Sequence, residues 1–381
     1  MTGLRILHLI DGLKIGGAEI LLRDLVRGLR DAGFQVSVGF STPGPIQQPI
    51  REMGISLTEL PRSMRVDPGL LLRMCKLIRR ERPQIVHTHL FKSDFHGRLA
   101  ARLCKVPVVV STAHNVDTWA RWAPLGYLYG LTARLADRII AVSDEVRDFQ
   151  IRYTNTPAVK IVTINNGVNT SMFENQIEKG MAVREELGLN GDTPVIGIIG
   201  RLERQKDHNT FLEAAANIKQ VLPEARFLVV GDGSLREEII ARARALDLLP
   251  SVIFCGIRED VPAVLAAIDL LVFSSRWEGL PVTLLEGMAS GLPIVSTAVG
   301  GIPGVVVENE TALLVPPESP AELAQACLFV LQNKELAQKF GRSGRKRAFE
   351  KYSIQTMISC TVEMYGNLWQ SYVTTANSPS L

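Results

Sequence analysis

The chain has 381 residues, of which 46% are hydrophobic and 21% charged, and both fractions are typical of a globular protein. Its formal net charge is +3. Such a small excess, without a zinc finger, an RNA-binding signature or a long basic run, argues against a nucleic-acid partner. The length is sufficient for two domains, each with its own core.

The N-terminal apolar run at residues 4–10 ends at Asp11-Gly12. It is too short for a signal peptide, so we interpret it as a first strand. No stretch of the sequence approaches about 18 uninterrupted apolar residues, so no membrane-spanning helix is expected. The five cysteines are odd in number and form no CxxC pair. Reduced thiols in a cytoplasm are the simplest explanation.

Short apolar runs alternate with helical patterns through the first half of the chain, which predicts a parallel sheet covered by helices. One helix is predicted at residues 18–32, where Gly33 is a stop signal. The predicted strands are residues 6–10, 36–40, 85–87, 108–111, 139–142 and 161–164.

The same alternation restarts after a polar, mostly helical connection at residues 172–188. The second set of predicted strands is residues 195–200, 226–230, 252–254, 270–273, 294–296 and 311–315. We therefore predict an α/β protein with two doubly wound, Rossmann-like domains, residues 1–172 and 173–353. The closing amphipathic segment, residues 354–381, is predicted as a helix that joins the first domain. Ligand is expected between the domains, over the strand ends.

A glycine pair, Gly16-Gly17, lies between the first strand and its helix, where backbone can approach a ligand closely. A plain tight turn explains the pair equally well. The surrounding sequence is not G-x-G-x-x-G, and the chain has no Walker A sequence. Simple dinucleotide binding therefore fits poorly.

Two carboxylates, Glu278 and Glu286, lie eight positions apart. Because Pro281 cannot lie inside a helix and Thr283 can cap one, we predict a helix that begins near Leu284. Its first free N–H groups would form an anion site. Glu286 would fall in the first turn, where its carboxylate could accept two hydrogen bonds from a ribose diol.

Each glutamate also has a simpler interpretation. Thr283-x-x-Glu286 is a capping box that needs no ligand, and from the spacing alone we favour the cap. Glu278 follows the apolar run at residues 270–273, and a loop at the carboxyl end of a parallel strand is where ligands bind in open α/β sheets. A solvated loop glutamate is an equal alternative.

The motifs converge when they are taken in chain order. They are Gly16-Gly17-Ala-Glu19, His114 in Ser-Thr-Ala-His-Asn, Asn166-Gly167-Val168, Gly200-Arg201…Lys206-Asp207, Gly231-Asp-Gly233, Glu278…Glu286 and the run at residues 293–303. As an ordered set over residues 5–352, they resemble the retaining glycosyltransferases of family 4 (glycosyl transferases group 1). The resemblance implies the GT-B fold, in which two Rossmann-like domains face each other across a cleft.

The resemblance also implies an activity: transfer of a hexose from a nucleoside-diphosphate sugar to a hydroxyl of a glycan or lipid-linked acceptor, with retention. Polysaccharide or glycolipid biosynthesis in a bacterium is the implied setting. The expected route is front-face attack, in which the departing phosphate oxygen accepts the proton of the acceptor hydroxyl. No metal or cofactor is expected besides the donor. Uridine diphosphate is preferred over guanosine diphosphate, although the residues identify neither base, sugar nor acceptor.

The family's functional residues can be placed on this sequence. The catalytic group would be Arg201, Lys206, Glu278 and His114. Arg201 and Lys206 would hold the pyrophosphate in place of a metal, because cations already in position stabilise the growing charge of the leaving group. Glu278 would bind the donor sugar, and His114 would line the reaction centre. The implied substrate-binding residues are Gly16, Gly17, Arg258, Leu284, Leu285 and Glu286. Arg258 would lie near the base.

Two further histidines, His87 and His89, are interpreted as strand-end residues, with His89 near the acceptor. Metal binding by this pair is not expected, because no third ligand is evident. Two positions depart from the family pattern. Asn169 replaces the usual Asp, and Gly304 replaces a frequent Glu, so the donor contacts near Gly304 are left open.

The segment at residues 117–135 is rich in Trp, Tyr, Leu and Arg, a composition shared with interfacial segments. A second basic face is formed by Arg73, Lys76, Arg79, Arg80 and Arg82. We favour a packed helix for the first and a solvated face for the second. The alternative is docking on the inner membrane. The predicted location is the cytoplasm, with a peripheral position at the inner membrane as this alternative hypothesis.

Two other functions remain open at this point. A nucleotide-sugar epimerase shares the GT-B architecture and needs no separate acceptor. A non-catalytic binder of sugar nucleotides is the other candidate. The presence of Arg201, Lys206 and His114 together with both glutamates argues against the binder.

Overall fold

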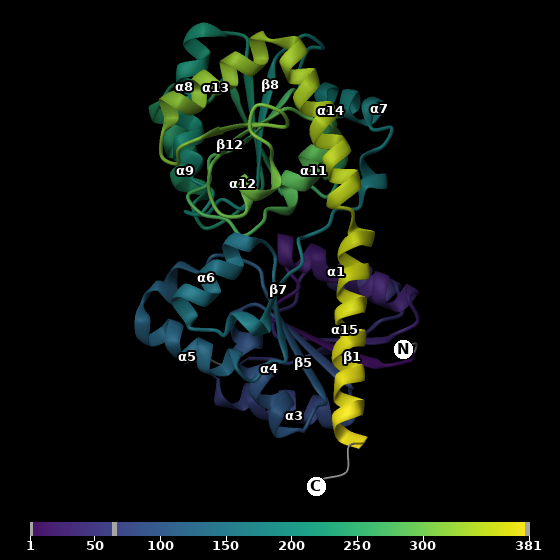
Figure 1. Cartoon of the computed structure of the whole chain (residues 1–381). Helices are drawn as coiled ribbons and strands as arrows, with labels where there is room; N and C mark the ends of the chain where they lie inside the picture. The colour runs from purple at the N-terminus through teal and green to yellow at the C-terminus, as the bar shows by residue number, and fades with distance from the viewer. Residues whose placement is uncertain (1–2, 63–66, 378–381) are drawn as a thin grey trace. The chain divides into compact units, whose positions relative to one another are not determined.

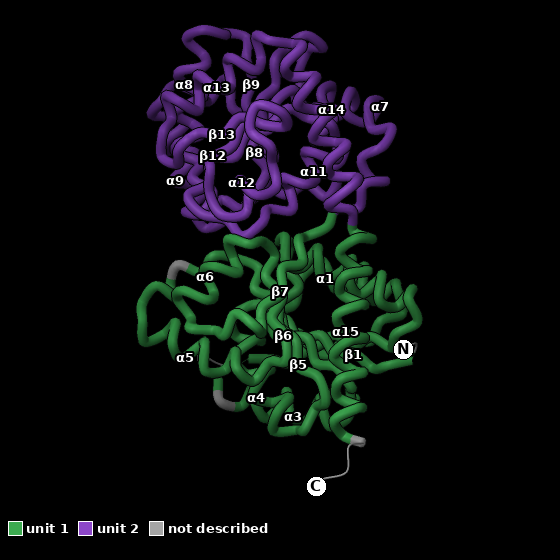
Figure 2. Tube along the Cα trace, viewed as in Figure 1, with its two compact units in different colours: residues 1–167, 354–381 green, residues 168–353 purple. Residues whose placement is uncertain are grey.

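The computed structural model describes residues 3–62 and 67–377, and the chain divides into two compact units (Figure 2). Unit 1 comprises Met1–Gly167 and Ile354–Leu381, and unit 2 comprises Val168–Ser353. The division falls near the predicted boundary at 172/173, and the closing helix belongs to unit 1. Residues 378–381, which the predicted helix included, lie outside the described residues.

In the described part of the chain, unit 1 is built on a seven-stranded parallel sheet in the order β3-β2-β1-β4-β5-β6-β7. The strands are β1 (Arg5–Ile10), β2 (Gln35–Phe40), β3 (Ser56–Glu59), β4 (Ile85–His89), β5 (Val108–Ala113), β6 (Arg138–Ala141) and β7 (Ile161–Thr163). All six strands predicted for this half are present, and β3 was missed. β3 is a short edge strand without a fully buried residue, so it lacks the apolar run of a central strand.

Helices cover the sheet of unit 1 (Figure 1). They are α1 (Gly17–Asp31), α2 (Gln47–Glu52), α3 (Pro68–Glu81), α4 (Phe91–Leu103), α5 (Ala123–Ala133), α6 (Asp144–Thr154) and α15 (Ile354–Asn377), with 3₁₀ turns η1 (Thr118–Arg121) and η2 (Ala158–Lys160). α15 packs on α1, where Ile358 lies against Gly28. A helix from the end of the chain therefore completes the first unit.

Unit 2 contains, within the described residues, a six-stranded parallel sheet in the order β10-β9-β8-β11-β12-β13. Its strands are β8 (Val195–Ile199), β9 (Arg226–Val230), β10 (Val252–Gly256), β11 (Leu270–Phe273), β12 (Ile294–Thr297) and β13 (Leu313–Val315). Each corresponds to a predicted strand. The prediction of two doubly wound Rossmann-like sheets is confirmed.

The helices of unit 2 alternate with its strands, except that one helix precedes β8 and two follow β13. They are α7 (Ile177–Glu186), α8 (His208–Val221), α9 (Arg236–Ala245), α10 (Val261–Ala266), α11 (Val282–Ser290), α12 (Ile302–Val305), α13 (Pro320–Gln332) and α14 (Lys334–Lys351), after the 3₁₀ turn η3 (Thr170–Phe173). Among all described helices of both units, none has the combination of length and apolar character needed to cross a membrane.

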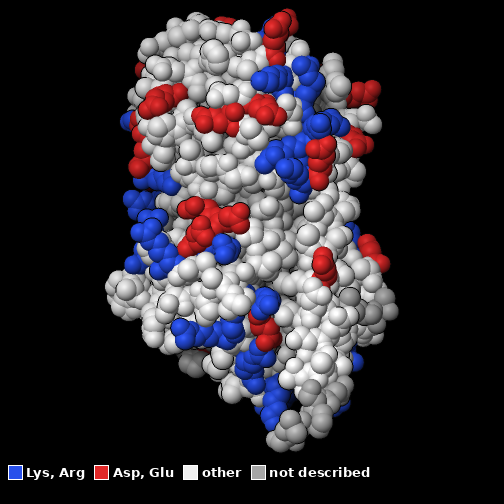
Figure 3. All heavy atoms as spheres, viewed as in Figure 1, with Lys and Arg blue, Asp and Glu red and all other residues white. Residues whose placement is uncertain are grey.

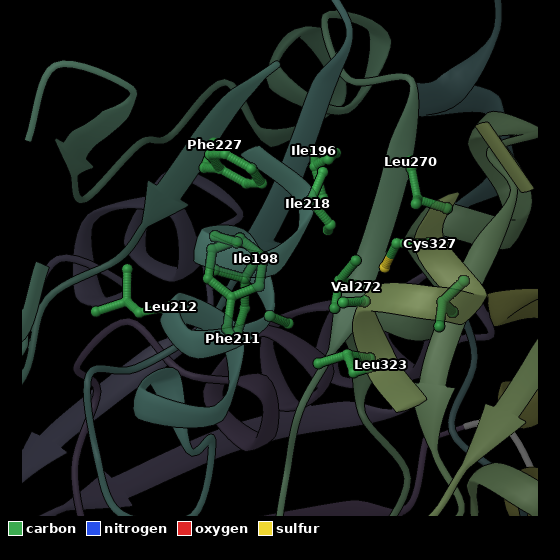
Figure 4. Packing of buried hydrophobic residues seen from close by; sticks show 14 of the residues in the cluster. Ile196, Ile198, Phe211, Leu212, Ile218, Phe227, Leu270, Val272, Leu323 and Cys327 are labelled. Carbon is green, nitrogen blue, oxygen red and sulfur yellow. The ribbon is translucent and has the colours of Figure 1, made fainter. Parts of the chain in front are cut away.

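The core of unit 2 explains why the sequences of its central strands are continuous apolar runs. Phe211 and Leu212 of α8 pack against Ile198, Phe227 and Val272 of three neighbouring strands (Figure 4). All five side chains are at most 3% exposed. Parallel strands with helices on both faces bury every side chain, so their sequences do not alternate. On the face drawn in Figure 3, Lys and Arg are interspersed with Asp and Glu.

Both sheets have a point where the strand order reverses. In unit 1 the chain adds β2 and β3 on one side of β1 and then β4 on the other, and in unit 2 β8 and β11 are the equivalent neighbours. Ligands of open α/β sheets bind outside the carboxyl ends of the strands at such a point. The loops after β1, β4, β8 and β11 are therefore the places to look for function.

Candidate functional site

In unit 2, the loops after β8 and β11 are joined by a partly buried ion pair. Lys206 Nζ donates to Glu278 Oε1 at 2.6 Å. Gln205 Nε2 donates to Glu278 Oε2 at 3.0 Å, and Ser275 Oγ to Oε1 at 2.7 Å. Glu278 is 4% exposed. The structure thus brings together the predicted cation loop and the first predicted glutamate, which are 72 residues apart in sequence.

Two glycines allow these loops to approach other backbone closely. Gly231, with φ +132°, lies so near Gly200 that a Cβ would fall 2.0 Å from the Gly200 carbonyl oxygen. Gly300, with φ +55°, is equally close to the carbonyl oxygen of Glu278. L-residues with a side chain rarely adopt this conformation, and here the side chain would also collide with backbone. The backbone at these two glycines therefore packs directly against the Arg201 and Glu278 loops.

The two predicted arginines differ in their surroundings. Arg201 is exposed and takes part in no ion pair among the described residues. Arg258, after β10, is held by Glu186 of α7 and by Asp260 at 2.7 Å. The hydrogen bonds that Arg258 donates to these two carboxylates raise its pKa above the ordinary value. Arg201 is therefore available to an anion, whereas Arg258 already has two carboxylate partners.

The helix after Glu278 begins earlier than predicted. α11 starts at Val282, two residues before Leu284, and its N-cap is Pro281, without a side-chain cap hydrogen bond. Proline fits there because its ring fixes φ near −65° and its missing N–H is not needed. Thr283 lies inside the helix, so it is not the cap. Glu286 is the fifth helical residue, so it does not lie in the first turn.

With this start, the predicted anion donors still lie in the first turn of α11. The Leu284 N–H donates to the Pro281 carbonyl oxygen at 3.2 Å, so it is already hydrogen-bonded. The Leu284 and Leu285 side chains are fully buried. The first four N–H groups of α11 belong to Val282, Thr283, Leu284 and Leu285, so both predicted donors lie in the first turn.

In unit 1, the predicted residues follow β1 and β5. Gly16 is the N-cap of α1 and Gly17 its first residue, as expected for a loop that leads from strand to helix. His114, half-buried, directly follows β5. Its Nε2 lies 3.1 Å from Nδ1 of His89, at the end of β4. The structure therefore brings His114 and His89 together, but it also shows a third histidine behind them.

That third residue is His8 of β1, which sequence reasoning missed. Its Nδ1 lies 3.0 Å from Nε2 of His89. The Cα atoms of His8 and His87 are register partners in neighbouring parallel strands. The expectation against a metal was based on the lack of a third ligand. This premise is wrong, because ligand atoms of His8, His87 and His89 lie within 4.8 Å of one another.

Burial keeps these imidazoles neutral. It lowers the pKa of His8 to about 3 and that of His114 to about 4. Burial, with repulsion from neighbouring imidazoles, also lowers the pKa of His87 and His89 well below the ordinary value. At neutral pH this group can donate and accept hydrogen bonds but has no charge.

A second residue missed by sequence reasoning is Asp117, four positions after β5. Burial raises its pKa to about 7, and the negative charges of Asp94 and Asp11 add to the shift. A carboxyl that titrates near neutrality beside a strand end is a candidate for proton exchange. No local sequence signal marks it, because the shift comes from residues distant in the chain.

Comparison with known proteins agrees with this arrangement. The model of Glycosyltransferase Family 4 matches residues 15–172, and that of Glycosyl transferases group 1 matches residues 181–347. Together the two matches contain the loops of both units. The chain belongs to glycosyltransferase family 4. The sequence-based assignment is confirmed, and the protein is a glycosyltransferase.

Two curated relatives illustrate the similarity. The chain is 34% identical over 252 residues to the UDP-Gal:α-D-GlcNAc-diphosphoundecaprenol α-1,3-galactosyltransferase of Escherichia coli, covering 64% of this chain and 65% of that protein. It is 30% identical over 306 residues to EpsF of Bacillus subtilis (strain 168), named as a glycosyltransferase, covering 76% and 78%. The chain thus spans just under two thirds of the length of the galactosyltransferase.

Solved structures show the same fold. The Anabaena protein Alr3699/HepE, in complex with UDP-glucose, has a TM-score of 0.87 at 22% identity, covering 95% of this chain and 99% of that one. WaaG, a glycosyltransferase involved in lipopolysaccharide biosynthesis, has a TM-score of 0.76 at 17% identity, covering 94% and 99%. The two Rossmann-like sheets are therefore those of the GT-B fold.

Proposed function

We propose that this glycosyltransferase moves a hexose from a uridine-diphosphate sugar to a hydroxyl of a lipid-linked glycan acceptor in a bacterium, with retention and without a metal. The observation that carries the proposal is the partly buried Lys206–Glu278 pair at the strand-order reversal of unit 2. The names of two similar proteins support the donor class, since one acts on UDP-Gal and the other holds UDP-glucose.

Glu278 is suited to hold one sugar hydroxyl. An ionised carboxylate has roughly four acceptor positions, and Lys206, Gln205 and Ser275 use three of them. Oε1 accepts from Lys206 and Ser275 and Oε2 from Gln205, so the remaining position lies on Oε2. A fixed carboxylate with one acceptor position left selects a hydroxyl by position, without reorganising when the ligand arrives.

Lys206 and Arg201 have different parts in holding the diphosphate. Lys206 Nζ has three N–H donors, of which one points to Glu278, so two are left for phosphate oxygens. Arg201 is exposed and adds a planar guanidinium that can bind two phosphate oxygens at once. The two cations would stabilise the nucleoside diphosphate as the glycosidic bond breaks and negative charge grows on the leaving oxygen.

The hydrogen bonds of Glu278 argue against a covalent sugar–enzyme intermediate. A carboxylate that accepts a hydrogen bond from an ammonium, an amide and a hydroxyl is a weak nucleophile. The acceptor hydroxyl would instead attack from the face of the departing phosphate, whose oxygen takes its proton. In this scheme His114 lines the sugar on the side of unit 1, and Gly16 and Gly17 allow backbone to come near the acceptor.

The acceptor class suggests a position at a membrane surface. The exposed side of η1 and α5 contains large apolar residues, which are Trp122, Leu125, Tyr127, Leu128 and Leu131; we call them the α5 patch. The opposite side of α5, with Tyr129 and Ala133, is buried in unit 1. Arg121 and Arg134 flank the α5 patch and are exposed. Aromatic and aliphatic side chains with flanking cations are typical of a surface that lies in a lipid headgroup region.

The proposed reaction is tested by incubating the purified chain with UDP-galactose, UDP-glucose and GDP-mannose, each with and without a polyprenyl-diphosphate-linked saccharide. We expect an α-linked product with a UDP-hexose only when the acceptor is present, and equal rates with and without EDTA. Conversion of the nucleotide sugar without acceptor would favour the epimerase. Binding of every donor without any product would favour the non-catalytic binder.

A further inference from the structure

Three histidines form a continuous hydrogen-bonded row inside unit 1. His114 Nε2 contacts His89 Nδ1 at 3.1 Å, and His89 Nε2 contacts His8 Nδ1 at 3.0 Å. We call these three residues the histidine row. It starts at the half-buried His114 and ends at His8, which is fully buried. At the inner end, Nε2 of His8 has no hydrogen-bond partner among the described residues.

His87 stands beside the histidine row but is not part of it. Its ring centroid lies 4.2 Å from that of His89, yet its nitrogens are used elsewhere. Nδ1 contacts the Tyr365 hydroxyl of α15 at 2.5 Å, and Nε2 contacts Thr112 Oγ1 at 2.7 Å. A metal ion bound by His8, His87 and His89 would have to replace hydrogen bonds at both of the latter residues. We therefore treat the cluster as a hydrogen-bond network.

A neutral imidazole has one N–H and one acceptor nitrogen, which leaves the histidine row only two complete arrangements. In the outward one, His8 Nδ1–H donates to His89, and His89 Nδ1–H donates to His114, whose own proton is on Nδ1. In the inward one, each donor direction is reversed, and His114 has its proton on Nε2. Any other combination places two protons or two lone pairs in one contact. The three tautomers therefore change together.

The inner end of the histidine row selects between the two arrangements. The inward arrangement leaves an N–H of His8 buried without an acceptor, and the outward one leaves only a lone pair. Orphaned buried N–H groups are the rarer of the two in proteins. Conversion from one to the other requires a proton at His8 Nε2, which has neither a partner nor exposure to water. The tautomers of the histidine row are consequently fixed, and the row does not conduct protons.

We propose that His8 and His89 are positioning residues that hold His114 as the Nδ1–H tautomer, so that its outer ring nitrogen is a permanent hydrogen-bond donor at the strand end. Free histidine in water prefers the opposite tautomer. This inference rests on the proposed function for the role of His114 toward the donor sugar, but the tautomer itself is a property of the ligand-free protein. A donor there would suit a sugar hydroxyl oxygen or a phosphate oxygen.

The test is ¹⁵N NMR of histidine side chains in the full chain, which reports the tautomer of each neutral imidazole without any substrate. We expect His114 to be protonated on Nδ1 in the unsubstituted protein. In His89→Leu we expect it to shift toward Nε2–H, with kcat lower by about 10-fold and KM for the nucleotide sugar little changed. His96→Leu is the matched control, because His96 lies on α4, where it contacts the Lys92 carbonyl oxygen and the Phe95 ring and no other histidine among the described residues.

Three outcomes would overturn the inference. They are a His114 protonated on Nε2 in the unsubstituted protein, a tautomer that is unchanged in folded His89→Leu, and stoichiometric transition metal in the purified chain. If His89→Leu does not fold, His8→Phe replaces it, since it removes the inner end and keeps an aromatic ring. An inactive enzyme that still shows the predicted tautomer would contradict the proposed function alone.

Discussion

The two units share a topology but build their strand-end sites from opposite chemistry. Unit 1 gathers neutral imidazoles, His8, His87 and His89, at most 2% exposed. Unit 2 pairs the buried carboxylate of Glu278 with the partly exposed Lys206. A buried polar group must be hydrogen-bonded, and a buried charge must be paired. At these strand ends, unit 1 meets the requirement by loss of charge and unit 2 by pairing of charge. Elsewhere unit 1 also pairs charge, since Arg98 and Asp94 form a buried ion pair at 3.3 Å.

The difference matches the two tasks of the proposed reaction. Fixed charges suit a diphosphate, whose negative charge grows during transfer. Neutral donors and acceptors suit sugar hydroxyls. Each prediction below separates the contribution of one unit from that of the other.

The largest effect is expected from Lys206→Met. It leaves Glu278 buried without its cation, which costs about 3 kcal/mol of unfolding free energy, and removes a phosphate donor, which lowers transfer by about 10³-fold. Chemical denaturation and initial rates measure the two losses. The double variant Lys206→Met with Glu278→Gln is the control. It should regain stability but not activity, and an active Lys206→Met would refute the assignment.

Acid should weaken unit 1 before unit 2. His8 has an ordinary pKa of 6.5 when unfolded and about 3 when folded, so below pH 6.5 the unfolded chain binds the extra proton. The contribution of His8 to the free energy of unfolding is fully present above pH 6.5 and is lost as the pH drops toward 3. For His8 alone the loss at pH 4 is about 3 kcal/mol. In the described part of unit 2, His208 is the single histidine, with its pKa lowered to about 4.

Hydrogen exchange at pH 7 and pH 5 measures this difference for each unit. We expect exchange of the β1 and β4 amides to be faster at pH 5, after correction for the intrinsic rate, than exchange of the β8 and β11 amides. Equal loss of protection in both units would show that the buried imidazoles of unit 1 do not determine its acid stability.

Arg201→Ala should affect the nucleotide and leave the fold intact. Because Arg201 is exposed and outside the ion pairs, its loss should change the unfolding free energy by less than about 0.5 kcal/mol. UDP should bind about 30-fold more weakly, the value of one charge-assisted contact of about 2 kcal/mol. Calorimetric titration measures the affinity. Arg204→Ala, an equally exposed arginine of the same loop, should bind UDP normally, and equal losses in both variants would indicate a general electrostatic effect.

The smallest effect concerns the α5 patch. Leu128→Ser should lower sedimentation with anionic vesicles by about 10-fold, since one buried leucine contributes about 1.5 kcal/mol, while transfer to a water-soluble acceptor stays unchanged. Ile177→Ser is the control, because Ile177 is an exposed apolar residue of unit 2. Unaltered sedimentation of Leu128→Ser would remove the α5 patch from the proposal.

The sequence predicted the strands because parallel strands buried on both faces form apolar runs. It placed α11 two residues late because Thr283 resembled a cap, whereas Pro281 itself precedes the first turn. The Lys206–Glu278 contact was beyond spacing arguments, since it depends on β8 and β11 being neighbours. His8 had a weak signal: His87 and His89 share a face of β4, and only the pairing of β1 with β4 places His8 beside them.

The most direct test of this division is hydrogen exchange of the full chain with and without saturating UDP. The account predicts new protection in unit 2, at residues 200–206 and 278–286, and none at β1 or β4 of unit 1. Protection confined to unit 1, or no protection at all, would contradict it.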